Sequence, residues 1–143
     1  MEISAARATL TVDACLRVLQ AALSHGRSQG HRIWVAVVDA NGELMGFIGC
    51  DGAPRISSQV AIDKAFTAAS TGQPTSAWKA YLLSAPEEER EILRSFPRYI
   101  GAEGGHPIVH EGLVIGGIGV SGANQQVDEE CARAGLAALD TAP

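Results

Sequence analysis

The stretch GAEGGHPIVHEGLVIGGIGVSGAN, residues 101–124, combines two glycine clusters, an apolar strand pattern and a helix cap in one short region. Gly104-Gly105 comes directly before His106-Pro107. Glycine permits positive φ and close backbone approach, while proline fixes its own φ and favours an extended residue before it. The pattern predicts a constrained turn that holds its side chains in place. His106, with Glu103 nearby in the sequence, is therefore our first candidate for chemistry.

Two strands are predicted within and after this turn. Residues 107–109 form a short strand pattern, and residues 113–120 form a longer one that contains three glycines. Glycine weakens a strand unless another backbone or a ligand comes close. The second strand is therefore expected to make an intimate contact with a helix or a ligand.

Two further strands are predicted nearer the N-terminus. Residues 33–38 are rich in β-branched residues and apolar on both faces, as in a central strand covered on both sides. Asn41-Gly42 is a strong hairpin signal, and the partner strand spans residues 43–49. Consecutive antiparallel strands argue against a dinucleotide-binding fold of the Rossmann type and favour an α+β class.

Helices are predicted between and after the strands from apolar periodicity and capping residues. Thr11 caps the first, and Ser57 or Ser58 caps an alanine-rich helix that ends at Gly72. Two short helices follow, over residues 75–83 and after Ser84. Ser121 or Asn124 caps the last, which runs through Leu139.

The composition limits the function. The length of 143 residues fits one domain, residues 1–143, and the net charge of −5 argues against a nucleic-acid or anionic-membrane partner. The chain has no apolar run of membrane-spanning length and no secretory signal pattern, so we expect a cytoplasmic protein. The three cysteines form neither a disulfide framework nor a zinc signature, so we expect free thiols and no metal site.

Further residues are candidates for binding a ligand together with the glycine-rich turn. Arg55 and Lys64 are cations that would pair with a ligand carboxylate. Lys64 lies among small apolar residues, so its stem can be buried while its ammonium reaches a cleft, although a solvated lysine is the commoner outcome. The other candidates are Asp51 and the backbone of Gly104, Gly105 and Pro107.

The order of these motifs resembles the haem-degrading domain family, also called GlcG/HbpS-like, which includes the C-terminal domain of PduO-type proteins. The residues that carry the resemblance are VAVVDANGELMGF, DGAP followed by AIDKAFTAA, and GGHPI leading into GLVIGGIGVSGA and DEECARAGL. The resemblance implies a profilin-like fold, with a five-stranded antiparallel sheet between helical layers (α/β/α), and homo-oligomers. It also makes haem, a corrinoid or another planar carboxylated compound a candidate ligand.

Three functions follow from these observations. The first is a small-molecule-binding module in which His106 is an axial haem ligand and Arg55 and Lys64 pair with carboxylates. The second is a cofactor-independent catabolic enzyme, an isomerase, tautomerase or hydrolase, in which His106 and Glu103 transfer protons on a small oxo or carboxylated substrate. The third is a structural or interaction subunit. The residues alone do not identify a cofactor.

Overall fold

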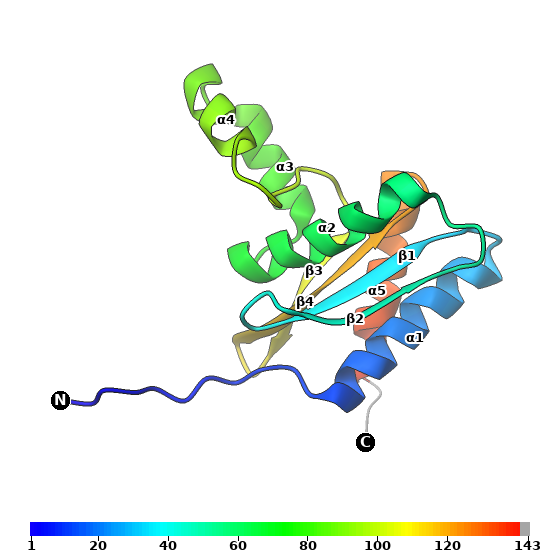
Figure 1. The fold of residues 1–143 in the computed structure, drawn as a ribbon, viewed down its shortest axis with the longest axis horizontal. Coiled ribbons are helices and arrows are strands. Elements are labelled where there is room, and N and C mark those ends of the chain that lie inside the picture. Colours follow the sequence, from blue (N-terminus) through cyan, green and yellow to red (C-terminus); the bar gives the residue numbers. More distant parts are fainter. Residues whose placement is uncertain (141–143) are drawn as a thin grey trace.

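The computed structural model describes residues 1–140 and has an α+β fold in which helices flank an antiparallel sheet (Figure 1). The elements in chain order are α1 (Val12–Ser28), β1 (Trp34–Asp39), β2 (Leu44–Gly49), the 3-10 helix η1 (Arg55–Ser57), α2 (Ser58–Thr71), α3 (Thr75–Ser84), α4 (Glu87–Arg94), β3 (Gly105–His110), β4 (Leu113–Ser121) and α5 (Gln125–Asp140). All the helices and strands that the sequence patterns predicted are present at these positions.

The sheet has the order β2-β1-β4-β3, and every neighbouring pair is antiparallel. β1 is central and its residues 35–38 are fully buried, as its two-sided apolar pattern predicted. Val35 and Val37 belong to the core on one face, and Ala36 and Val38 to the core on the other. The period of two in side-chain direction accounts for this division.

The expectation of a fifth strand is wrong for the part of the chain that the structure describes. The sheet holds the four strands that the residue patterns predicted, and the fifth came only from the family resemblance. The long connection between α2 and β3 folds as α3 and α4 and adds no strand to the sheet. The profilin-like label stays a prediction.

The helices lie in two layers. α1 and α5 pack together on one face of the sheet, α2 covers the other face, and α3 and α4 extend away from it (Figure 1). The larger core lies under α1 and α5 and contains the free cysteines Cys15 and Cys131, whereas the free Cys50 is half-buried at its edge. Within residues 1–140, no helix has both the length and the apolar character needed to cross a membrane.

Three glycines bring α2 into contact with the backbone of the sheet. A Cβ at Gly117 would lie 2.5 Å from the Ala65 carbonyl oxygen, and one at Gly105 would lie 2.6 Å from the Lys64 carbonyl oxygen. A Cβ at Gly119 would collide with the carbonyl oxygen of Ala61. The intimate contact that the strand glycines predicted is therefore confirmed, and the neighbour is a helix.

We expect Gly119→Ala to lower the free energy of unfolding by at least ~2 kcal/mol, because the added methyl group meets helix backbone that cannot move independently. Urea denaturation at equilibrium measures this. Gly30→Ala is the control: a Cβ there meets no atom within 4 Å, so only the strain of its positive φ, about 1–2 kcal/mol, applies. A smaller loss for Gly119→Ala than for Gly30→Ala would contradict the packing argument.

Candidate functional site

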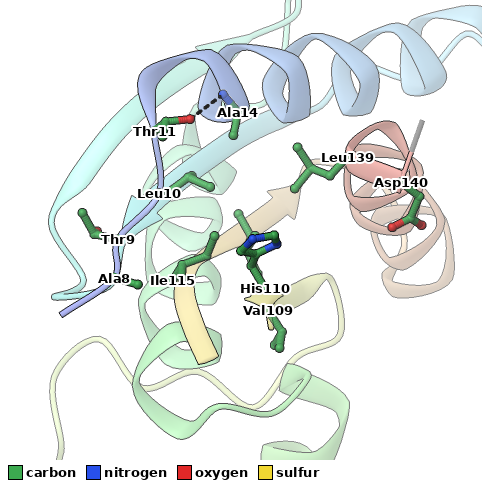
Figure 2. Close-up of a pocket in the computed structure, with 11 residues that line it drawn as sticks. Ala8, Thr9, Leu10, Thr11, Ala14, Val109, His110, Ile115, Leu139 and Asp140 are labelled. Atoms are coloured by element: carbon green, nitrogen blue, oxygen red, sulfur yellow. Dashed lines mark hydrogen bonds between the residues drawn. The ribbon is translucent and has the colours of Figure 1, made fainter. Parts of the chain in front are cut away.

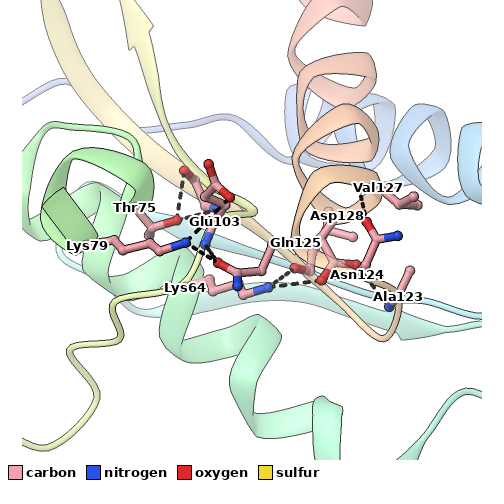
Figure 3. Close-up of polar contacts among 11 residues, drawn as sticks. Lys64, Thr75, Lys79, Glu103, Ala123, Asn124, Gln125, Val127 and Asp128 are labelled. Carbon is pink, nitrogen blue, oxygen red and sulfur yellow. Dashed lines mark hydrogen bonds and ion pairs between the residues drawn. The ribbon is translucent and has the colours of Figure 1, made fainter.

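A buried ion pair joins the two helical layers beside the glycine-rich turn. Lys64 of α2 and Asp128 of α5 are 2% and 3% exposed, and Nζ lies 3.2 Å from Oδ2 (Figure 3). Nζ also donates to the Val120 carbonyl at 2.8 Å, and Asp128 Oδ1 accepts from the Ala123 N–H at 3.1 Å. Lys64 thus meets protein acceptors inside the molecule.

Burial opposes the charged forms of both partners. It lowers the pKa of the Lys64 ammonium, and the attraction of Asp128 offsets only part of this effect. Burial likewise raises the pKa of the Asp128 carboxyl, although Lys64 and the Ala123 N–H act in the opposite direction. The attraction therefore does not recover the whole cost of desolvation, as is common for buried pairs. The pair holds α2 and α5 in a fixed geometry.

Gly104 leaves space for this ion pair. Its φ is +119°, and a Cβ there would lie 2.6 Å from the Val120 carbonyl oxygen and 2.9 Å from Lys64 Nζ. The next residue, Gly105, donates its N–H to Thr75 Oγ1 at 2.9 Å. The predicted constraint on the turn is thus confirmed. The contacts that impose it come from other parts of the same chain.

His106 pairs with Glu129, a residue that the sequence analysis did not single out. The imidazole Nε2 lies 2.5 Å from Glu129 Oε1, which also accepts from Arg133 Nε at 3.1 Å. Glu129 Oε2 is buried and has no hydrogen-bond partner among residues 1–140. Burial alone would raise the pKa of Glu129, but the hydrogen bonds and charges of His106 and Arg133 hold it below its usual value.

Glu103 lies in a different contact. Its carboxylate is 3.8 Å from Lys79 Nζ, and its backbone N–H donates to Gln125 Oε1 at 3.1 Å (Figure 3). Both side chains of the ion pair are more than a third exposed. In place of the expected pair of His106 and Glu103, the structure therefore contains two separate pairs, each with a partner from another element.

The remaining predicted residues are spread along the chain. Asp51 follows β2, Arg55 begins η1, and both are exposed, whereas Pro107 is half-buried within β3. Of the eight predicted residues, the structure brings together Lys64, Gly104 and Gly105. Asp128 and Glu129 were missed because acidic residues near the start of a helix are explained by the helix dipole alone. No local signal distinguished them from Glu130.

A cavity of about 340 Å³ lies at the opposite end of β3. It is enclosed by the N-terminal segment, the β3–β4 hairpin and the end of α5 (Figure 2). The lining is mostly apolar, with His110 and Asp140 as its ionisable side chains. Leu10 anchors the N-terminal segment here, because its side chain is buried and its N–H donates to the Ile115 carbonyl at 2.9 Å.

A larger groove, of about 540 Å³, runs between α1 and the edge strand β2. Its volume lies within the range usual for ligand pockets, roughly 300–1,000 Å³. The lining is apolar over most of its length and carries one cation, Arg27, at the end of α1. The lining residues are Leu16, Leu19, Gln20, Leu23, Ser24, Arg27, Phe47 and Ile48.

Comparison with known proteins identifies the family. The family model described as haem degrading protein HbpS-like matches residues 10–137. The chain belongs to this family. The crystal structure of HbpS is 36% identical, covers 96% of this chain and 94% of its own, and superposes with a TM-score of 0.88. Among curated protein sequences, no match is found.

Two other structures related to this HbpS-like chain extend the comparison. A double mutant of Streptomyces reticuli HbpS, with two glutamates changed to aspartate, is 35% identical, covers 95% of this chain and 90% of its own, and has a TM-score of 0.87. A PduOC–haem complex is 24% identical, covers 91% of this chain and 94% of its own, and has a TM-score of 0.83. At that identity the likeness to PduOC shows the fold alone.

The depressed pKa of Glu129 makes a pH-dependent prediction. A carboxylate whose folded pKa lies below its unfolded value of 4.5 stabilises the fold above that pH, and this stability is lost as the pH falls through the folded pKa. We therefore expect Glu129→Gln to lower the free energy of unfolding at pH 6 and to flatten its decline from pH 5 to pH 3. Urea titrations across this range measure both. Glu130→Gln, one residue away and exposed, is the control; an equally flattened decline in that variant would contradict the assignment.

Proposed function

We propose that this HbpS-like chain binds haem, or a closely related planar carboxylated tetrapyrrole, in the groove between α1 and β2. The observation that carries the proposal is the groove itself, which combines a volume of about 540 Å³, an apolar lining and one cation. The family description, which names haem, supports this choice of ligand class. A tetrapyrrole has an apolar face to bury and carboxylates that pair with cations.

The lining fits the body of such a ligand better than its metal. Leucine, isoleucine and phenylalanine side chains suit the macrocycle, and the Arg27 guanidinium suits a carboxylate at its rim. Among the residues that the structure describes, the groove is lined by no histidine, cysteine, methionine or tyrosine, which are the usual axial ligands of haem iron. We therefore propose recognition through the macrocycle and a carboxylate. The iron-free porphyrin is then a ligand too.

The sequence-based proposal of His106 as axial ligand predicts a different outcome. Its Nε2, the outer ring nitrogen, is already hydrogen-bonded to Glu129. Binding through His106 requires that contact to open and makes affinity depend on the iron. Comparing haemin with iron-free protoporphyrin therefore separates the two modes.

Tryptophan fluorescence gives a direct readout of groove binding. Trp34 stacks on the groove residue Phe47 with ring centroids 5.1 Å apart, and Trp78→Phe leaves Trp34 as the sole tryptophan. In that background we expect haemin and protoporphyrin to quench Trp34 with similar affinity. Leu16→Glu should weaken both at least ~10-fold, because a carboxylate on the apolar wall meets an apolar face and repels the ligand's carboxylates. Arg27→Gln should weaken both about 5-fold through loss of one exposed charge pair.

Matched substitutions on the same helix control for general effects. Val12 is 66% exposed and Leu16 is 59% exposed, but only Leu16 lines the groove. Val12→Glu and Arg17→Gln should therefore leave binding unchanged. Equal weakening in the control and groove variants, or tight binding of haemin with none of protoporphyrin, would show that the groove is the wrong site.

We also propose that the protein is a homo-oligomer that uses the pair formed by α3 and α4. This pair extends from the sheet, and α4 packs mainly on α3 (Figure 1). The pair exposes the large apolar side chains of Tyr81, Leu83 and Ile92, and Phe96, just after the end of α4, is exposed as well. A second copy of the chain is the occupant that the family resemblance favours.

Native mass spectrometry tests this assembly. We expect an oligomer for the unmodified chain and a loss of most of it in Ile92→Glu, because a carboxylate would be buried in the contact. Leu113→Glu is the control, since Leu113 is 57% exposed and lies at the start of β4, outside the α3–α4 pair. A monomeric unmodified chain, or an unchanged oligomer in Ile92→Glu, would refute the proposal.

The enzyme alternative has less support. A proton-transfer site requires His106 and its partner to reach a bound substrate, and the cavity and the groove described above are lined by other residues. His106 is only 9% exposed, and its Nε2 is held by Glu129. These contacts favour a role for His106 in fixing β3 to α5.

A further inference from the structure

A third, smaller pocket of about 210 Å³ lies where α1 and β2 end. Its lining is mainly polar and comes from two segments that are distant in sequence. The residues are Arg27, Gly30, His31 and Arg32 from the first segment, and Cys50 and Asp51 from the second. Arg27 also lines the α1–β2 groove, whereas Arg32 does not.

The cations of this pocket are not neutralised by the protein. In residues 1–140, the ion pairs of the structure involve neither Arg27 nor Arg32. The chain carries only eleven lysines and arginines against sixteen acidic residues, so two unpaired guanidiniums beside an imidazole form a local positive site on a negative protein. In the described part of the chain, Asp51 supplies the one carboxylate of the lining, and it forms no ion pair within 4 Å there.

The backbone around Arg32 leaves room for its side chain. Gly52 has a φ of +75°, and a Cβ there would lie 3.1 Å from Arg32 Nη1. Gly122 lies against the Arg32 carbonyl oxygen, 2.7 Å from where its Cβ would stand. A side chain at Gly52 would therefore crowd the Arg32 guanidinium, whereas a side chain at Gly122 would crowd the Arg32 backbone.

Size and chemistry together indicate the ligand class. A volume of about 210 Å³ is below the usual range for drug-sized ligands, roughly 300–1,000 Å³, and suits a small anion. Guanidinium groups present paired N–H donors that match the oxygens of phosphate, and a neutral or charged imidazole adds a further N–H. The Cys50 thiol is at most a weak donor.

We propose that this pocket is a binding site for a small phosphate-bearing anion, held by Arg32 and Arg27 with His31. Asp51 faces the same space and weakens binding by repulsion. The pocket shares Arg27 with the tetrapyrrole groove, but His31, Arg32 and Asp51 do not line that groove, so variants at Arg32 and Asp51 distinguish the two sites.

Chemical-shift titration of the full chain with inorganic phosphate and with pyrophosphate, at constant ionic strength, tests the site. We expect saturable shifts of the backbone amides of His31, Arg32, Cys50 and Asp51. Arg32→Gln should weaken binding about 5-fold, and Asp51→Asn should tighten it about 2- to 5-fold, as expected for removal of one partly exposed charge of either sign. A variant that merely unfolded the protein would weaken binding. Tighter binding by Asp51→Asn therefore cannot be explained by damage to the fold.

Arg17→Gln is the matched control, because Arg17 is an exposed arginine of α1 outside the pocket. It should leave the phosphate affinity unchanged. Shifts that never saturate, equal weakening by Arg17→Gln and Arg32→Gln, or no tightening by Asp51→Asn would each overturn the site. Arg32→Gln should keep its affinity for protoporphyrin, so failure of the groove proposal and failure of this one give different results.

Discussion

The close contact of α2 with the backbone of β3 and β4 is the constraint on which the rest of the structure depends. It exists only because Gly105, Gly117 and Gly119 present no Cβ to the helix, whose carbonyl oxygens occupy that space. A helix this close to the sheet needs small residues of its own, which explains the alanine-rich stripe of α2. It also brings Lys64 close to the end of β4, where its side chain reaches Asp128 in the helical layer on the other face of the sheet.

The ion pair then ties the second helical layer to the first. Removing two charges from water costs free energy, and apolar residues of similar volume often stabilise a fold equally well. Their value here is directional, because Lys64 Nζ, the Val120 carbonyl and Asp128 meet at one point and fix the start of α5 relative to α2. The position of α5 in turn places Glu129 opposite His106. A contact between one helix and a strand backbone therefore determines the partner of the histidine that the sequence made most conspicuous.

Local features of the sequence predicted the elements well and the contacts between them poorly. Alternation, the Asn41-Gly42 turn and the helix caps gave four strands and the principal helices, because each depends on neighbouring residues. The fifth strand failed because it was carried over from a resemblance and no residue pattern supported it. The partner of His106 lies 23 residues away on another element, so only the direction of α5 decides between Glu103 and Glu129. The α1–β2 groove was also missed, since Leu16 and Phe47 have the same periodicity as residues that face a filled core.

The glycine-rich stretch that suggested a binding site is constrained, because its backbone and side-chain groups already contact other parts of the protein. Gly104 makes space for an ion pair, Gly105 donates to Thr75, and His106 is hydrogen-bonded to Glu129. A ligand in this region would have to displace contacts that hold the two layers together. The side of the molecule formed by α1 and β2 has fewer contacts of this kind. β2 is a sheet edge, α1 exposes Leu16, and within residues 1–140 neither Arg27 nor Arg32 forms an ion pair with a carboxylate. Unsatisfied groups are the ones free to bind, so the surface least constrained by the fold is the better place to look for function.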